Sequence, residues 1–184
     1  LIYGIATLPP IDFIYTVHPE YRLLASLPGE GFTFGNSLLF WALGKVSVTG
    51  GFFPPMNEVY HYPYLCAGWF GLFVTAINLM PVGQLDGGHI LYALVGSKWQ
   101  TVVAKVFFGV LVLIGLIGLI PFIDPGFRFG TAGWLVWALM MLFLIKLKHP
   151  EVPDTEEIDV NRRMLGWATL LLLFFIFPPV PFME

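Results

Sequence analysis

The feature that most constrains the fold is a run of 19 uncharged residues at 64–82. A helix of that length rises about 28 Å, close to the roughly 30 Å hydrocarbon core of a bilayer. Three more apolar stretches follow, at 102–123, 131–147 and 164–177. The chain is 57% hydrophobic and only 11% charged, with a mean hydropathy of +0.79, which exceeds what a soluble domain of 184 residues would bury. We therefore expect an all-α fold, a polytopic membrane helix bundle embedded in a lipid bilayer.

The positive charges predict an orientation for this bundle. If each apolar stretch crosses once, six of the nine Lys and Arg residues share one side, which the positive-inside rule makes cytoplasmic. Those six are Lys98, Lys105, Lys146, Lys148, Arg162 and Arg163. This orientation places Asp86 near the cytoplasmic face. The net charge of −3, without a basic stripe, argues against nucleic acid as a partner.

The expected organisation is a single membrane domain covering residues 1–184. Its predicted parts are the end of a span at 1–9, a non-cytoplasmic loop at 10–63 with a short interfacial helix at 36–46, and a transmembrane bundle at 64–184. Because Leu1 opens directly on apolar residues, we expect the first span to begin before it. A helix start is expected at Asp159, after a polar loop. Gly115 and Gly118 predict close helix packing.

An interrupted helix is predicted at residues 78–90, NLMPVGQLDGGHI. Pro81 removes a backbone hydrogen bond, and Gly83 permits conformations that other residues resist. The helix should therefore unwind between Asn78 and Asp86 and resume as a short helix that Gly96 closes. Unwound backbone at membrane depth is tolerated only where protein or a water-filled cavity lines it.

Asp86 has two interpretations from its position alone. As an N-cap it would accept hydrogen bonds from the amides that follow it. As a cation ligand it would be paired with the bound ion. That ion would offset the cost of an unpaired carboxylate in a membrane, about 3 kcal/mol. Gly87 and Gly88 are expected to leave this carboxylate uncovered, which favours the approach of a divalent ion.

The motif NxxPxxxLDGG resembles the second signature motif of the site-2 protease family, the intramembrane zinc metalloproteases. Asn78, Pro81, Leu85, Asp86, Gly87 and Gly88 carry this resemblance. The wider stretch 67–96 is similar to the family throughout, and later segments look like a bacterial and plastid branch.

The resemblance implies that Asp86 is the third protein ligand of a catalytic Zn²⁺. The other two ligands would be histidines of an HExxH helix, whose glutamate is the general base. The substrates implied are transmembrane proteins. Asn78, Pro81 and Gly83 would face the substrate, while Gly87, Gly88 and His89 would support the metal site.

None of the four histidines begins an HExxH sequence, so the general base is absent from these residues. We expect the HExxH helix upstream of Leu1, and the chain alone should not hydrolyse anything. One alternative is a catalytically inactive homologue that binds transmembrane helices, and another is a transporter, since transporters also use broken helices. His89 is expected to have a packing or hydrogen-bonding role. The remaining histidines, His18, His61 and His149, are expected on the surface, and Glu58 is expected away from the site.

Overall fold

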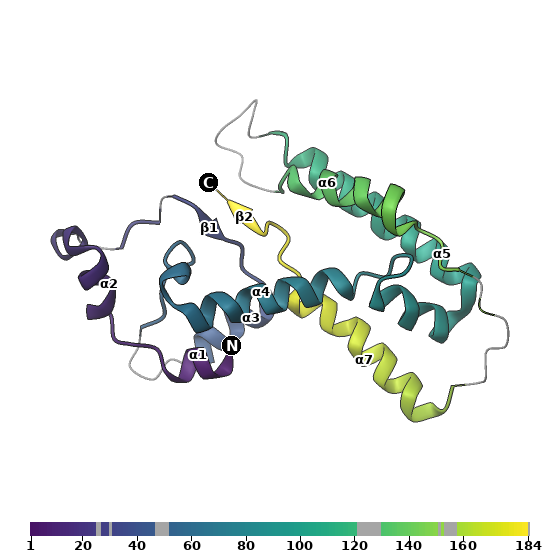
Figure 1. Cartoon of the computed structure of the whole chain (residues 1–184), viewed down its shortest axis with the longest axis horizontal. Helices are drawn as coiled ribbons and strands as arrows, with labels where there is room; N and C mark the ends of the chain where they lie inside the picture. The colour runs from purple at the N-terminus through teal and green to yellow at the C-terminus, as the bar shows by residue number, and fades with distance from the viewer. Residues whose placement is uncertain are drawn as a thin grey trace.

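The computed structural model describes residues 1–24, 27–29, 31–46, 52–120, 130–150, 152 and 158–183. The chain is mostly helical, as expected, and is drawn in Figure 1. Its α-helices are α1 (Ile2–Ala6), α2 (Asp12–Val17), α3 (Leu38–Val46), α4 (Pro63–Asn78), α5 (Asp86–Ile117), α6 (Gly133–Met140) and α7 (Val160–Ile176). Shorter elements are the 3₁₀ turns η1 (Pro19–Leu23) and η2 (Val59–His61), the π-helical turn η4 (Met141–Ile145), and the strands β1 (Thr33–Phe34) and β2 (Phe182–Met183).

The first third of the chain packs around the N-terminal half of α4. Ile14, Phe40 and Leu65 are fully buried in this core. The antiparallel pair of β1 with β2 brings the C-terminal residues back to the same region, at the top of Figure 1. The Trp69 indole N–H then donates to the Gly35 carbonyl at 2.7 Å. Residues 33–35, α4 and the C-terminal strand β2 thus meet in one region.

Helices α5 and α6 pack against each other at the upper right of Figure 1. A side-chain carbon at Gly115 would crowd Leu135, and one at Gly118 would overlap the backbone of Thr131. The expectation that these two glycines mark close packing is confirmed. Trp134 is fully buried beside them, and its indole N–H donates to the Pro179 carbonyl at 2.7 Å.

One helix of the described part of the chain, α5, is long and apolar enough to cross a membrane, judged by length and composition. Gly96, with φ of 77°, places a kink inside it, so the straight part follows Gly96. The other apolar helices, at Pro63–Asn78 and Gly133–Ile145, are shorter than the spans expected from the sequence. In α4 the reason is the interruption after Asn78, which ends the helix before the apolar run ends. Residues 121–123 of the expected second span lie outside the described residues.

Two local expectations agree with the structure. Helix α3 occupies most of the predicted helix at 36–46. Helix α7 begins one residue after Asp159, whose carboxylate accepts the amide of Arg162 at 2.8 Å. An Asp at this position satisfies an amide that the first helical turn leaves unpaired.

Candidate metal centre at the interrupted helix

The interruption lies between the end of α4 at Asn78 and the start of α5 at Asp86. The intervening turn is held by short backbone hydrogen bonds, including Val82 N–H to the Met80 carbonyl at 2.8 Å. The Gly83 amide donates outside the turn, to the Leu147 carbonyl at 3.2 Å. The turn is therefore folded against the segment that follows η4, and its backbone is largely paired.

The glycines of the motif are explained by this packing. Gly83 has φ of 52°, and a side-chain carbon there would overlap the carbonyl oxygen of Lys146. One at Gly87 would overlap the Leu79 carbonyl, and one at Gly88 would overlap the Gly83 carbonyl. We expected Gly87 and Gly88 to uncover the Asp86 carboxylate. They are instead buried, and they let the turn fold back onto the first turn of α5.

Asp86 itself is exposed at the first residue of α5. The N-cap position belongs to Leu85, and no side chain caps this helix end. The N-cap interpretation of Asp86 is therefore wrong, because the helix starts one residue earlier than expected and Asp86 is its first helical residue. Within the described segments the carboxylate makes no hydrogen bond or ion pair, so it is available to a ligand from outside them.

A histidine pair lies one helical turn further along α5. His89 Nδ1 contacts His149 Nε2 at 2.5 Å, and His149 Nδ1 lies 2.6 Å from its neighbour's carbonyl at Pro150. A carbonyl only accepts, so His149 donates through Nδ1 and, when neutral, accepts at Nε2 from His89. His89 then keeps a bare Nε2 on an exposed ring. The hydrogen-bonding role expected of His89 agrees with this contact.

His149 was expected on the surface but is only 5% exposed. Its ring stacks on Tyr92 with centroids 4.3 Å apart, and its amide donates to Gln100 Oε1 at 3.2 Å. Gln100 is fully buried and also donates to the Leu147 carbonyl. These contacts, made across about fifty residues of sequence, anchor the segment after η4 to α5.

The predicted substrate-facing residues differ in accessibility. Asn78 is exposed at the end of α4, and Pro81 lines a large apolar groove between α3, α5 and α7 with a volume of about 1100 Å³. Gly83 is buried, and its amide is already paired with Leu147, which leaves no free backbone donor there.

The donors near Asp86 do not make a complete zinc site. A catalytic zinc takes three protein ligands and keeps a fourth position open for water. Asp86 offers one carboxylate and His89 one imidazole nitrogen, so at least one further donor is needed. The chemistry of Asp86 fits a zinc ligand, but the site needs donors from outside these residues.

The structure also gathers three residues that the sequence did not bring together, His18, Glu58 and His61. Their potential ligand atoms lie within 4.8 Å of one another. We expected His18 and His61 on the surface, but each side chain is no more than 25% exposed, and Glu58 is buried. The three-residue spacing of Glu58 and His61 was the signal in the sequence that these two side chains could lie close together. Nothing in the sequence placed His18 beside them.

Comparison with known proteins confirms the resemblance to the site-2 protease family. Residues 44–121 match peptidase family M50. The chain is 30% identical over 152 residues to the probable zinc metalloprotease EGY2, chloroplastic, of Oryza sativa subsp. indica, which covers 81% of this chain and 25% of that protein. It is 34% identical over 123 residues to the probable zinc metalloprotease EGY1, chloroplastic, of Arabidopsis thaliana, covering 65% and 20%.

The chain thus spans 25% of the length of the rice EGY2 proteins and 17–20% of the other curated relatives it matches. No solved structure gives a significant match. The matched region runs from the end of α3 to the end of α5 and contains the whole interruption with Asp86.

Proposed function

We propose, from the match of residues 44–121 to peptidase family M50, that this chain is part of an intramembrane zinc metalloprotease in which Asp86 is one ligand of the catalytic Zn²⁺. The observation that carries the proposal is the exposed Asp86 carboxylate, which neither caps α5 nor pairs with a described side chain. Two histidine ligands and the general base come from a segment outside these 184 residues. When bound, the ion supplies an activated water and polarises the scissile carbonyl.

The membrane part of the proposal is supported by the surface of the helices. Helix α5 presents Val102, Leu113 and Leu116 to the outside, and α7 presents Leu171 and Phe175, all at least 40% exposed. Monomeric soluble proteins rarely expose contiguous apolar patches of this kind. A lipid bilayer would cover these side chains. We propose a multi-pass domain with Asp86 toward the cytoplasmic side, as the distribution of Lys and Arg predicts.

The substrates in this proposal are transmembrane proteins, and the apolar groove between α3, α5 and α7 receives their membrane-spanning segment. The groove is lined almost wholly by apolar side chains and reaches Pro81 in the interrupted helix. Asn78 lies exposed at the same interruption, and no described residue accepts or donates a hydrogen bond to its side chain. A substrate strand that leaves helical geometry exposes unpaired amides and carbonyls, which the Asn78 amide group can bind.

The test is made on the native protein that contains these 184 residues, with a single-span membrane protein as reporter. Asp86→Asn keeps the size of the side chain and removes its charge. We expect this variant to lose cleavage and the equivalent of zinc bound at Asp86, while keeping its thermal melting point. The matched control is Asp12→Asn, which removes an exposed carboxylate from the first turn of α2. Full cleavage or full zinc content in Asp86→Asn would contradict the proposed ligand.

A second candidate function rests on the lack of an HExxH sequence within these residues. A homologue without the general base would bind transmembrane helices and leave them intact. This candidate predicts that the native protein retains the reporter in detergent pull-down but does not cut it. It also predicts that Asp86→Asn leaves this retention unchanged.

A further inference from the structure

Three side chains from two segments meet near the N-terminal end of α4. His18 precedes η1, Glu58 precedes η2, and His61 ends η2. His18 Nε2 lies 3.2 Å from His61 Nε2 and 3.8 Å from Glu58 Oε2. His61 Nε2 lies 3.6 Å from the same carboxylate oxygen. The three atoms form a nearly equilateral triangle.

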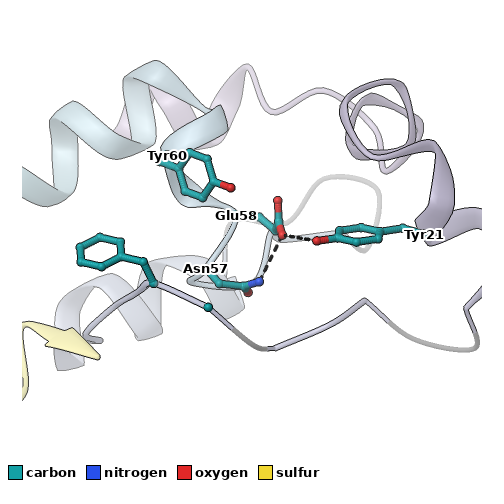
Figure 2. Close-up of a pocket in the computed structure, with 6 residues that line it drawn as sticks. Tyr21, Asn57, Glu58 and Tyr60 are labelled. Carbon is teal, nitrogen blue, oxygen red and sulfur yellow. Dashed lines mark hydrogen bonds between the residues drawn. The ribbon is translucent and has the colours of Figure 1, made fainter. Parts of the chain in front are cut away.

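The carboxylate of Glu58 is fixed and buried, at 1% exposure. Figure 2 shows Tyr21 and Asn57 donating to one of its oxygens, Oε1, at 3.3 and 3.1 Å. The other oxygen, Oε2, is buried without a hydrogen-bond partner and is the one that faces the two histidines. No Lys or Arg of the described segments forms an ion pair with Glu58. A carboxylate buried without a cation is destabilising, so this position favours a bound positive charge.

The protons available to the triangle are too few to pair its atoms. His18 Nδ1 lies 3.1 Å from a carboxylate oxygen of Glu20, which only accepts, so the neutral His18 ring is protonated at Nδ1 and bare at Nε2. His61 can bring one proton through Nε2. Two acceptors, His18 Nε2 and Glu58 Oε2, therefore compete for one donor.

The nearby Tyr62 does not supply the missing proton to the triangle. Its hydroxyl is buried and makes no hydrogen bond with any described residue. Burial, with a smaller contribution from the negative charge of Glu58, raises the pKa of Tyr62 to about 12.

We propose that His18, Glu58 and His61 form a binding site for a divalent transition-metal ion, with Zn²⁺ as the ion that their ligand types fit best. The observed triangle has a point about 2.1 Å from all three atoms, which is the usual length of zinc bonds to histidine nitrogen and carboxylate oxygen. Glu20 would hold the His18 ring in the tautomer that leaves Nε2 free. A carboxylate behind a metal-bound histidine is a frequent arrangement in zinc sites.

This site is separate from Asp86 and does not depend on the proposed protease activity. The two lie beyond opposite ends of α4, whose 16 residues rise about 24 Å. A bound ion would tie the segment around His18 to the start of α4. A cavity of about 260 Å³ borders Glu58, and Tyr21, Asn57 and Tyr60 are among its lining residues (Figure 2).

The experiment is equilibrium dialysis of Zn²⁺ against the 184-residue chain in detergent, after treatment with a chelator. We expect one equivalent of bound zinc in the wild type. Glu58→Gln, which keeps the shape of the side chain, should weaken binding by more than about 100-fold, and Glu20→Gln by about 10- to 100-fold. Co²⁺ should give the intense visible bands of a four-coordinate site in the wild type and not in Glu58→Gln.

Two controls separate loss of the site from loss of the fold. Asp86→Asn and His149→Ala remove a carboxylate and a buried histidine elsewhere, and both should keep one equivalent of zinc. In chelator, Glu58→Gln should melt at the wild-type temperature or above it, because the change removes a buried charge that has no cation. Zn²⁺ should raise the melting temperature of the wild type alone. The exposed Glu20 keeps the test valid if Glu58→Gln does not fold. Wild-type affinity in both Glu variants, or no zinc binding by the wild-type chain, would overturn the proposal.

Discussion

Gly87 is the residue whose role changes most between sequence and structure. Its position beside Asp86 in the sequence predicted open space for a ligand at the carboxylate. In the structure Gly87 is instead buried against the Leu79 carbonyl. Gly87 has helical backbone angles that any residue can adopt. Glycine is required there only because the turn at residues 79–83 packs closely against it. A methyl group there must push the turn away from α5.

We predict that Gly87→Ala destabilises the protein by about 2 kcal/mol or more, in the range of an overpacked core. The control is Gly109→Ala, because a side-chain carbon at Gly109 meets no atom within 4 Å. That change should be neutral or stabilising by up to about 1 kcal/mol from helix propensity. Chemical denaturation in detergent measures both. Equal stabilities of the two variants would show that the turn does not press on Gly87.

The role of a single residue could be predicted from the sequence where it depends on that residue's own backbone preferences. Pro81 and Gly83 indicate the interruption because their own backbone limits produce it. The cluster of His18 with Glu58 and the burial of His149 were not predictable, because each depends on contacts over more than forty residues. A sequence read segment by segment contains no information about such contacts.

The positions of the helices could be predicted from the sequence, but their lengths could be predicted less well. Helix α7 begins where Asp159 indicates, since an N-cap acts through the next few residues. Helix α4 is shorter than its apolar run because Asn78 is its last helical residue, although Leu79, Met80 and Val82 remain buried in the turn that follows. Hydropathy reports burial or lipid contact and does not distinguish a helix from a buried turn.

We predict that Asp159→Ala lowers the stability of α7 by about 1 kcal/mol, the usual cost of losing an N-cap. The carboxylate accepts the Arg162 amide at 2.8 Å, and alanine leaves this amide without its partner. Asp12→Ala is the control, because Asp12 stands in the first turn of α2 and makes no capping bond. Hydrogen exchange of the amides in the first turn of α7 should speed up in Asp159→Ala alone.

The kink in α5 leads to a second prediction at this scale. Gly96 has φ of 77° and ψ of 173°, a region almost confined to glycine, yet a side-chain carbon there would meet no atom within 4 Å. Gly96→Ala should therefore cost about 1 to 3 kcal/mol of backbone strain without any steric clash. Gly109→Ala is again the matched control within α5. If both variants melt at the same temperature, the kink relaxes freely and Gly96 does not fix it.

At the scale of the molecule, contacts bring the C-terminal strand onto the first third of the chain. The pairing of β1 with β2 and the bond from Trp69 to Gly35 gather the C-terminal residues onto the first third of the chain. The Lys and Arg distribution adds an orientation, since it predicts that the start and the end of the α5–α6 hairpin share one side of the membrane. The end of α5 and the start of α6 would then lie on the other side.

This orientation can be tested by cysteine labelling, because Cys66 is the single cysteine of the chain and can be replaced by serine. In that background, Lys98→Cys and Asn161→Cys should react with a membrane-impermeant maleimide from the cytoplasmic side of sealed vesicles. Gly133→Cys, at the start of α6, should react only from the opposite side, and all three positions are exposed. The reason is that α5 after its kink has the length of one span, so its two ends cannot share a face. Labelling of all three from one side would contradict the crossing of α5, and a full reversal would contradict the orientation alone.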